Sequence, residues 1–243
     1  MQFTGKRVLI TGGSSGIGLA LTRALVADGA EVHVTGRDQA KLDRVAAEHN
    51  RISGHACDVV DDDAVRALRD TLIARGGVDV LINNAGVMAF FKILDRYPLA
   101  EQIKEIDIDA VGPIRMIEHF LPSMLDREST IINVSSGLAY VPYAPTPVYS
   151  AAKAFVHAYT RCLREQLRGT SVRVVELLPP VVDTPLAAGI DTPFPRMPPE
   201  KLAAALIRGL RRGKTEIAPG ISAPLRWMDR LSPGLAFRLL NKG

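Results

Sequence analysis

Short apolar runs rich in β-branched residues alternate with segments of helical periodicity along almost the whole chain. The seven runs are 7–11, 31–35, 52–57, 78–83, 130–134, 172–178 and a weaker one at 215–218. Strands that alternate with helices of about ten or more residues indicate βαβ crossovers, and near-continuous apolar strands suit a parallel sheet covered on both faces. The alternation therefore predicts an α/β fold with a doubly wound, seven-stranded parallel sheet.

The segment 184–200 differs from the rest of the chain in its proline content. Proline lacks a backbone N–H and breaks a regular helix, so we expect a loop or short helical turns that cover the substrate. The prolines are Pro185, Pro193, Pro195, Pro198 and Pro199. No linker, repeat or low-complexity tract divides the chain before residue 185, so we expect residues 1–243 to form a single domain.

The tail 221–243 combines large apolar side chains with arginines. Pro233 and Gly234 interrupt any long amphipathic helix in it. We therefore expect the tail to dock on its own chain, and contact with a membrane surface or a partner chain is the alternative.

Composition excludes several classes of protein. The net charge is only +4 and the basic residues are scattered, so nucleic acid is not expected as a partner. Cys57 and Cys162 form no CxxC pair and the five histidines have no metal-ligand spacing, so we expect no disulfide scaffold and no metal. No stretch of 18 apolar residues and no leader-like N-terminus is present, which predicts a cytoplasmic protein without a transmembrane segment.

A glycine-rich turn, TGGSSGIG at residues 11–18, directly follows the first strand, and a helix begins within it. Glycines allow a tight turn and a close approach to a pyrophosphate, while the free amides of a helix N-terminus favour the anion. This context predicts a Rossmann-type dinucleotide site. Its expected ligands are Gly12, Ser14, Ser15, Gly16, Ile17 and Gly18.

Three further motifs accompany this turn. Residues 83–86 are NNAG, Ser136, Tyr149 and Lys153 are spaced by thirteen and four residues, and PPVVDT at 179–184 follows the sixth strand. Together with the TGxxxGxG spacing, they resemble the short-chain dehydrogenase/reductase family over nearly the whole chain. Within that family, residues 134–154 and 176–184 look most like bacterial oxidoreductases of the DltE type. The resemblance implies a nicotinamide-dependent oxidoreductase.

Tyr149 and Lys153 lie four residues apart at a predicted helix start, so both side chains project from one face. A phenol has a pKa of about 10, and lowering it by about three units needs roughly 4 kcal/mol. One positive charge about 4 Å away supplies roughly this amount at an effective dielectric constant of about 20. We therefore expect Tyr149 to act as general acid and base, with Ser136 as a hydrogen-bond partner of the substrate oxygen.

Asp109 is a departure from the family pattern. The resemblance places a catalytic asparagine in a motif like INxxG, where this chain has IDAVG at 108–112. An ionised Asp109 close to Lys153 would oppose the effect of the lysine on Tyr149. We expect it to point away, to be protonated or to slow the reaction, while still holding the backbone and a relay water as the asparagine does by resemblance.

The end of the second strand predicts the choice of cofactor. Gly36 offers no acidic group to a ribose 2′-hydroxyl, and Arg37 is suited to clamp a 2′-phosphate, which favours NADP(H) over NAD(H). An ordinary exposed Arg37, with Asp38 capping the next helix, is the alternative. By resemblance, cofactor contacts come also from Tyr149 and Lys153 and from Asp58, Val59, Asn84, Ala85, Gly86, Pro179, Val182 and Thr184.

Three loops are expected to enclose the substrate: those after residue 86 and after Ser136, and the segment 184–200. Their apolar side chains favour a hydrophobic ketone, aldehyde or secondary alcohol, although Arg196 offers a place for a carboxylate. The expected contacts are Met88, Leu138, Tyr143, Leu186 and Phe194, with Phe90 and Phe91 near them.

Two expectations concern the whole molecule. The resemblance implies a homodimer or homotetramer that associates through residues 106–125 and the helix at 148–167. The alternative to an enzyme is a cofactor-binding sensor or scaffold with weak or no turnover, for which Asp109 is the only argument. A sugar-nucleotide epimerase is disfavoured by the glycine spacing and the short chain after the sixth strand.

Overall fold

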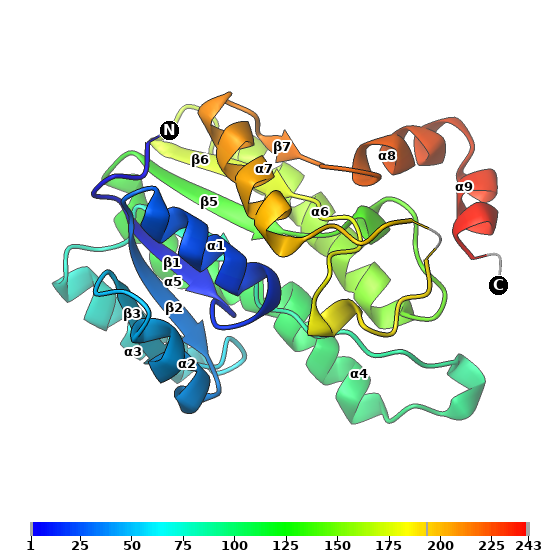
Figure 1. Cartoon of the computed structure of the whole chain (residues 1–243), viewed down its shortest axis with the longest axis horizontal. Coiled ribbons are helices and arrows are strands. Elements are labelled where there is room, and N and C mark those ends of the chain that lie inside the picture. Colours follow the sequence, from blue (N-terminus) through cyan, green and yellow to red (C-terminus); the bar gives the residue numbers. More distant parts are fainter. Residues whose placement is uncertain (1, 193, 242–243) are drawn as a thin grey trace.

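The computed structural model describes residues 2–192 and 194–241, so Pro193 and the last two residues of the tail lie outside the described residues. Its centre is one sheet in which every strand pair is parallel (Figure 1). The strands are β1 (Arg7–Thr11), β2 (Glu31–Gly36), β3 (Ile52–Ala56), β4 (Val80–Asn83), β5 (Ser129–Val134), β6 (Val172–Leu177) and β7 (Glu216–Ile217). The predicted seven-stranded parallel sheet is confirmed.

The strand order is β3-β2-β1-β4-β5-β6-β7, so the winding direction reverses between β1 and β4. Val8 of β1 pairs with Val32 of β2 on one side and with Val80 of β4 on the other. In an open α/β sheet the connections leave in opposite directions at such a switch point, and a crevice opens beyond the carboxyl ends of the strands. The glycine turn and the NNAG motif both lie at this crevice.

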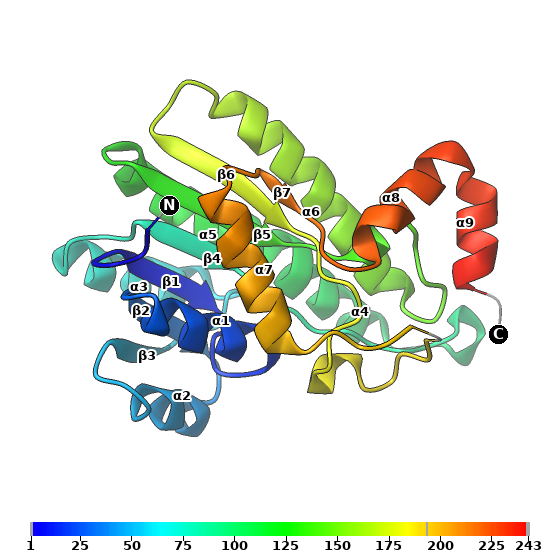
Figure 2. The same cartoon turned by 45° about the horizontal axis from the view of Figure 1, so that its top comes forward.

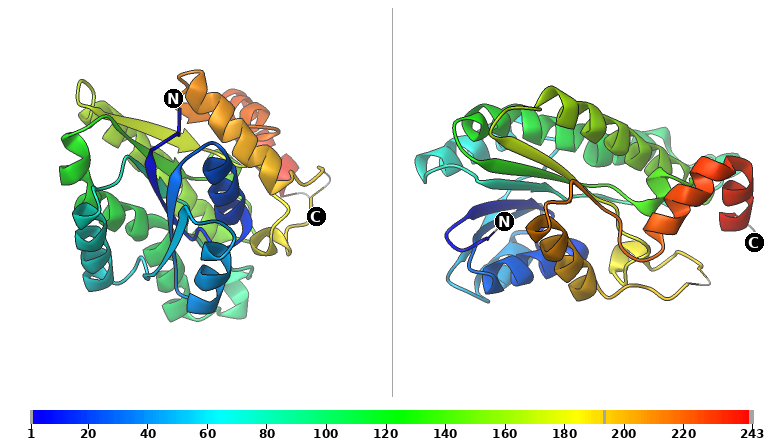
Figure 3. Two further views of the ribbon diagram at one scale, coloured as in Figure 1. Left: turned by 60° about the vertical axis from the view of Figure 1, so that its left-hand side comes forward. Right: turned by 90° about the horizontal axis from the view of Figure 1, so that it is seen from above.

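Helices cover both faces of the sheet, as Figures 2 and 3 show. One face carries α1 (Gly16–Ala27), α2 (Gln39–Ala46) and α7 (Pro199–Arg211), whose apolar side chains form one core cluster with the strands. The other face carries α3 (Asp62–Ala74), α5 (Gly112–Leu125) and α6 (Pro147–Gln166), which form a second cluster. The strands are apolar on both faces because both are buried.

Local sequence signals explain two helix ends. Gly29 follows α1 with a φ of 92°, the left-handed conformation that glycine adopts without a steric penalty. Asp38 precedes α2, and its side chain accepts a hydrogen bond from the backbone N–H of Lys41 at 3.1 Å. The helix cap at Asp38, which belongs to the alternative account of Arg37, is present.

The stretch from residue 99 to residue 125 is not one regular helix. It consists of α4 (Leu99–Ile106), a π-helical turn η2 (Asp107–Val111) and α5. A π-turn adds a residue to the helical path and re-aims the side chains that it carries. Here it turns Asp109 into the interior, where its side chain is fully buried.

The proline-rich segment and the tail both lie beyond the carboxyl ends of the strands. Within residues 184–200, η4 (Pro185–Ala187) is a short helical turn, and an isolated parallel bridge between Val182 and Met197 closes the loop. In the tail, α8 (Ser222–Leu231) and α9 (Pro233–Leu240) are two short helices, and the chain turns sharply between them at Pro233, as expected (Figure 1).

The tail contacts its own chain. Asn241 donates a hydrogen bond from Nδ2 to the carbonyl oxygen of Pro142 at 3.0 Å and accepts one from the backbone N–H of Ala144 at 2.6 Å. Leu225 and Ala236 form a small buried cluster with Val141. Within the described part of the chain, no helix is both long and apolar enough to cross a bilayer.

Candidate active site

The glycine turn is built for close approach of the backbone. Gly12 and Gly16 have φ values of 66° and 49°, in the left-handed region that favours glycine. Ser15 precedes α1 without capping it through its side chain, so the first amides of the helix stay available to a ligand. This arrangement fits a pyrophosphate.

The NNAG motif braces this turn from the neighbouring strand. Asn84 donates from Nδ2 to the carbonyl oxygen of Thr11 at 2.9 Å, and the Thr11 hydroxyl accepts from the backbone N–H groups of Asn84 and Ala85 at 2.9 and 3.0 Å. A side chain on Gly86 would place its Cβ 2.9 Å from a carboxylate oxygen of Asp109. The hydrogen bonds of the motif therefore join β4 to the glycine turn. The missing side chain at Gly86 leaves space for the carboxylate of Asp109.

Ser136, Tyr149 and Lys153 meet at the wall of one cavity of about 420 Å³. Ser136 follows β5, while Tyr149 and Lys153 lie in the first two turns of α6. The Ser136 hydroxyl and the Tyr149 phenol are hydrogen-bonded to each other. The ammonium of Lys153 lies 5.3 Å from the centroid of the Tyr149 ring. The predicted cluster is thus assembled.

The electrostatics of Tyr149 differ from the sequence argument. Burial raises the pKa of the phenol above its usual range, although the charge of Lys153 and the hydrogen bond from Ser136 lower it, and Asp109 adds to the increase. The spacing of four residues accounts only for the stabilisation of the phenolate by the charge of Lys153. The cost of burying a phenolate in the interior is larger than this stabilisation, so the pKa of Tyr149 rises.

Asp109 points at Lys153 instead of away from it. The separation between Oδ2 of Asp109 and Nζ of Lys153 is 3.0 Å, and Oδ1 accepts a hydrogen bond from the backbone N–H of Val87 at 2.8 Å. Burial raises the pKa of Asp109, against the opposing effects of Lys153 and Val87. Although burial alone would lower the pKa of Lys153, the charge of Asp109 keeps it raised. Both ends of this contact lie in the protein interior.

Most of the predicted contact residues line the cavity. Among the predicted cofactor ligands, the wall is formed by Gly12, Ser15, Gly16, Ile17, Asn84, Ala85, Gly86, Pro179, Val182 and Thr184. Among the predicted substrate contacts, it is formed by Met88, Leu138, Leu186 and Phe194. These residues come from four stretches of the chain: 12–17, 84–88, Leu138 and the loop after β6.

Several predicted residues do not reach this wall. They are Ser14, Gly18, Arg37, Asp58, Val59 and Tyr143. Tyr143 instead starts the turn before α6, where its backbone N–H donates to the hydroxyl of Ser150 at 3.1 Å. Its role as a substrate contact stays a prediction.

Arg37 and Asp58 lie near each other beside the open end of the glycine turn. Their closest side-chain atoms are 4.0 Å apart, and the side chain of Arg37 is 56% exposed. Lys41, on the first turn of α2, lines the cavity and was missed by the sequence reasoning. Its spacing from Gly36, five residues, would have placed it one helical turn beyond the end of the second strand.

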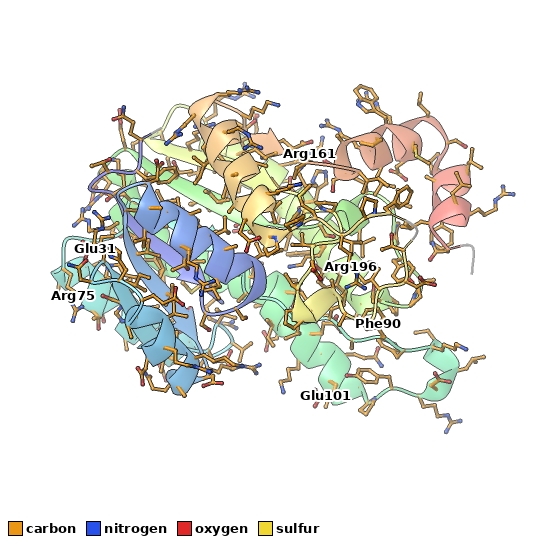
Figure 4. The ribbon with its side chains drawn as sticks, viewed as in Figure 1. Glu31, Arg75, Phe90, Glu101, Arg161 and Arg196 are labelled. Carbon is orange, nitrogen blue, oxygen red and sulfur yellow. The ribbon has the colours of Figure 1, made fainter. Side chains whose placement is uncertain are left out.

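The covering segment is packed against the loop after NNAG. A Cβ on Gly189 would lie 2.9 Å from the ring of Phe90, so the two segments touch there. The guanidinium of Arg196 donates to the carbonyl oxygens of Ala188 and Ile190 at 3.3 and 2.9 Å. Figure 4 labels Phe90 and Arg196 at this side of the molecule. Arg196 is therefore used to hold its own loop, which weakens the suggestion that it receives a carboxylate.

The tail also contributes to the cavity, a contact between distant segments that no local motif predicts. Ile221, Leu225 and Leu240 form part of its wall. They add apolar side chains to the same lining as Leu138 and Leu186. Within the described residues, no group of three or more histidine, cysteine or acidic side chains is arranged to hold a metal.

The parallel sheet, the glycine turn at its switch point and the Ser136, Tyr149 and Lys153 cluster together define a short-chain dehydrogenase. A family model described as short chain dehydrogenase matches residues 6–193. The chain belongs to this family and is an oxidoreductase of the short-chain type.

Individual relatives agree with the more specific resemblance. The chain is 36% identical over 253 residues to "Uncharacterized oxidoreductase DltE" of Bacillus subtilis (strain 168), with 99% of this chain and 98% of the relative covered. A short chain dehydrogenase from Burkholderia cenocepacia J2315, solved in complex with NADP, superposes with a TM-score of 0.89 at 24% identity, covering 100% of both chains. A short chain dehydrogenase/reductase from Burkholderia phymatum, in complex with NAD, has a TM-score of 0.84 at 24% identity, covering 95% of this chain and 96% of the other.

Proposed function

We propose that this protein is an NADP(H)-dependent oxidoreductase that interconverts a hydrophobic ketone or aldehyde and the corresponding alcohol. The observation that carries the proposal is the meeting of Ser136, Tyr149 and Lys153 at one end of a cavity whose other end is the glycine turn. A nicotinamide bound there supplies or accepts the hydride. The walls formed by Gly12, Gly16 and Thr184 would hold the dinucleotide.

The proton chemistry belongs to the side chains of this chain. In the reductive direction the Tyr149 hydroxyl gives its proton to the substrate oxygen, and in the oxidative direction the phenolate takes it back. In the structure the Ser136 hydroxyl is hydrogen-bonded to Tyr149. When a substrate is bound, its single O–H would turn to the substrate oxygen and orient it. Lys153 stabilises the phenolate through its positive charge, which burial in the interior makes effective at this distance.

The preference for NADP(H) rests on the basic groups beside Gly36. Arg37 and Lys41 present two cations at the side of the cavity where a ribose 2′-phosphate would lie, and Gly36 presents no carboxylate to repel it. Asp38 reduces this field, since its carboxylate is 3.3 Å from the ammonium of Lys41. Both basic side chains are about half exposed, and each lies near one carboxylate, Arg37 near Asp58 and Lys41 near Asp38.

The proposed substrate class follows from the walls of the cavity beyond Tyr149. They are largely aliphatic or aromatic, and the only charged side chains of the lining within the described residues are Lys41 and Lys153. Lys41 is near the cofactor end and Lys153 is paired with Asp109, so neither is placed to bind an anionic substrate. The apolar wall is formed by Met88, Leu138, Leu186, Ile190, Phe194, Ile221, Leu225 and Leu240.

A second candidate function is a cofactor-binding sensor or scaffold with little turnover. The specific observation in its favour is the 3.0 Å contact between Asp109 and Lys153, because a neutralised lysine stabilises a phenolate less. The intact Ser136, Tyr149 and Lys153 favour the enzyme.

The experiment that separates the two follows the absorbance of NADPH and NADH with a panel of ketones, aldehydes and alcohols. Tyr149→Phe removes the proton donor and keeps the ring, so we expect turnover to fall by about two to four orders of magnitude while cofactor affinity is retained. Equal turnover of both proteins would favour the scaffold.

We also propose a homodimer or homotetramer in the cytoplasm. Ile106, Leu125 and Phe155 are exposed apolar side chains on the segments at 106–125 and 148–167. Cys57 and Cys162 are free thiols, which suits a reducing compartment. Sedimentation of the purified protein tests the first part, and cell fractionation tests the second.

A further inference from the structure

Glu105 is a buried acid that the sequence reasoning passed over. It lies on α4, one helical turn before Asp109, and is only 2% exposed. Its Oε1 accepts a hydrogen bond from the backbone N–H of Ala89 at 3.3 Å. Its Oε2 is buried and has no hydrogen-bond partner in the described part of the chain. A buried carboxylate with one unpaired oxygen is much more costly than a buried neutral carboxyl.

The neighbours of Glu105 are the charged groups of the active site. From η2 it faces Asp109, and from α6 it faces Lys153 and Tyr149. On its own helix, Glu101 and Lys104 are exposed and 3.9 Å from each other. The pKa of Glu105 is raised to about 7. Burial is the largest cause and the charge of Asp109 adds to it, while the hydrogen bond from Ala89 and the charge of Lys153 act in the opposite direction.

The charge count shows why these groups act together. Lys153 contributes one positive charge, while Glu105 and Asp109 contribute two negative charges if both ionise. Two carboxylates in one desolvated site resist double ionisation, so they share a proton that belongs to the pair. With that proton bound, the charges of Lys153, Glu105 and Asp109 sum to zero. Without it, the three groups carry one net negative charge next to the Tyr149 phenol.

We propose, building on the oxidoreductase function above, that Glu105 and Asp109 form a carboxyl pair that holds one proton beside Lys153 and biases Tyr149 toward proton donation. The pair opposes formation of the phenolate whenever it carries a negative charge, and most strongly after it has lost its last proton. Tyr149 thus stays a phenol over a wide pH range, and the site is suited to carbonyl reduction. Glu105 is a positioning residue in this scheme, since it acts through Asp109 and Lys153.

Titration of the carboxyl groups in the whole protein, without added cofactor, tests the pair directly. Carboxyl-selective ¹³C NMR of the unmodified chain should show one buried carboxyl that titrates near pH 7, and Glu105→Gln should remove that titration. Glu101→Gln, which changes an exposed acid of the same helix, should leave it in place. Titration of every carboxyl of the unmodified chain below pH 5 would overturn the proposal, whether or not any variant folds.

The pH dependence of carbonyl reduction gives the second readout. Glu105→Gln removes one acid from the pair, so the alkaline fall in kcat should move to lower pH by about one unit, and Asp109→Asn should move it in the same direction. Glu101→Gln should not move it. If kcat of Glu105→Gln fell at the same alkaline pH as kcat of the unmodified chain, the proposal would be overturned. Absence of turnover with every carbonyl would instead refute the oxidoreductase function, while the NMR titration would still decide on the pair.

Discussion

A Cβ atom on Gly18 would lie 2.1 Å from the carbonyl oxygen of Gly12 and 2.7 Å from the side-chain amide of Asn84. Gly12 in the glycine-rich loop and Gly18 in the first turn of α1 therefore approach each other so closely that no side chain fits between them. This contact places the N-terminal amides of α1 at the cavity, because any separation of helix and turn would move them away. Gly18 thus serves the cofactor site without lining it.

Gly18→Ala should weaken both the fold and dinucleotide binding. The added methyl meets backbone, which cannot move without shifting the turn, so we expect a loss of about 1–3 kcal/mol in the free energy of unfolding. The affinity for NADPH should fall with it, since the phosphate-binding amides move. Denaturant unfolding and fluorescence titration with NADPH measure the two effects. Gly234→Ala is the matched control, since nothing lies within 4 Å of its Cβ position; equal behaviour of the two variants would refute this account.

The sheet and the glycine turn were predictable because their signals are local. A run of β-branched residues followed by glycines and a helical pattern specifies strand, turn and helix within about twenty residues. The seven strands of the sheet lie within two residues of the predicted ranges at each end. The family resemblance implied that Ser136 meets Tyr149 and Lys153, and the spacing of four residues placed Tyr149 and Lys153 on one helix face.

The missed features depend on tertiary contacts. Glu105 is acidic and lies in an amphipathic helix, a pattern typical of an exposed side chain, but the packing of α4 on α6 buries it. Leu225 and Leu240 reach the cavity only because the tail folds back over residues 137–144. The raised pKa of Tyr149 reflects burial, which a spacing of four residues does not encode. Such features require the arrangement of distant segments.

Arg37→Ala and Lys41→Ala should each raise the Michaelis constant for NADPH much more than that for NADH. A charge-assisted hydrogen bond to a phosphate contributes about 1.5–3 kcal/mol, so we expect increases of roughly 10- to 100-fold for NADPH. Steady-state kinetics with both cofactors measures this. Arg44→Ala is the control, because Arg44 is an exposed cation of α2 that donates to the carbonyl oxygen of Ala40. Equal increases for NADPH and NADH would count against NADP(H) as the cofactor.

Glu176 joins β6 to the strand that precedes Ser136. It is fully buried and accepts hydrogen bonds from the hydroxyl of Ser135 at 2.5 Å and from Nδ1 of His157 at 2.9 Å. Glu176→Ala leaves the Ser135 hydroxyl without this partner in the interior and removes the partner of the partly exposed His157, so we expect the free energy of unfolding to fall by about 3 kcal/mol. Urea unfolding measures it. The control is Glu165→Ala, an exposed acid whose loss should cost less than about 1 kcal/mol; equal costs would show that burial of Glu176 carries no weight.

His33 and His55 form a contact that should make the protein sensitive to acid. Nδ1 of His33 lies 3.1 Å from Nε2 of His55, between β2 and β3, so at least one ring nitrogen must be an unprotonated acceptor. Burial lowers the pKa of each imidazole from 6.5 to about 4, and Arg75 contributes to both shifts. The unfolded chain therefore binds more protons than the folded one between these values. Stability should be full above pH 6.5 and should decrease as the pH falls toward 4.

Each histidine should contribute a slope of at most about 1.4 kcal/mol per pH unit in that window. Urea unfolding at intervals from pH 7.5 to pH 4.5 measures the slope. His55→Gln removes one of the two groups, so the loss of stability on acidification should be roughly halved. His49→Gln takes away a histidine that belongs to neither strand and should leave the slope unchanged. A free energy of unfolding that stayed constant from pH 6.5 to 4.5 would mean that both imidazoles bind protons in the folded protein as readily as in the unfolded chain. The description of His33 and His55 as a neutral pair between β2 and β3 would then be wrong.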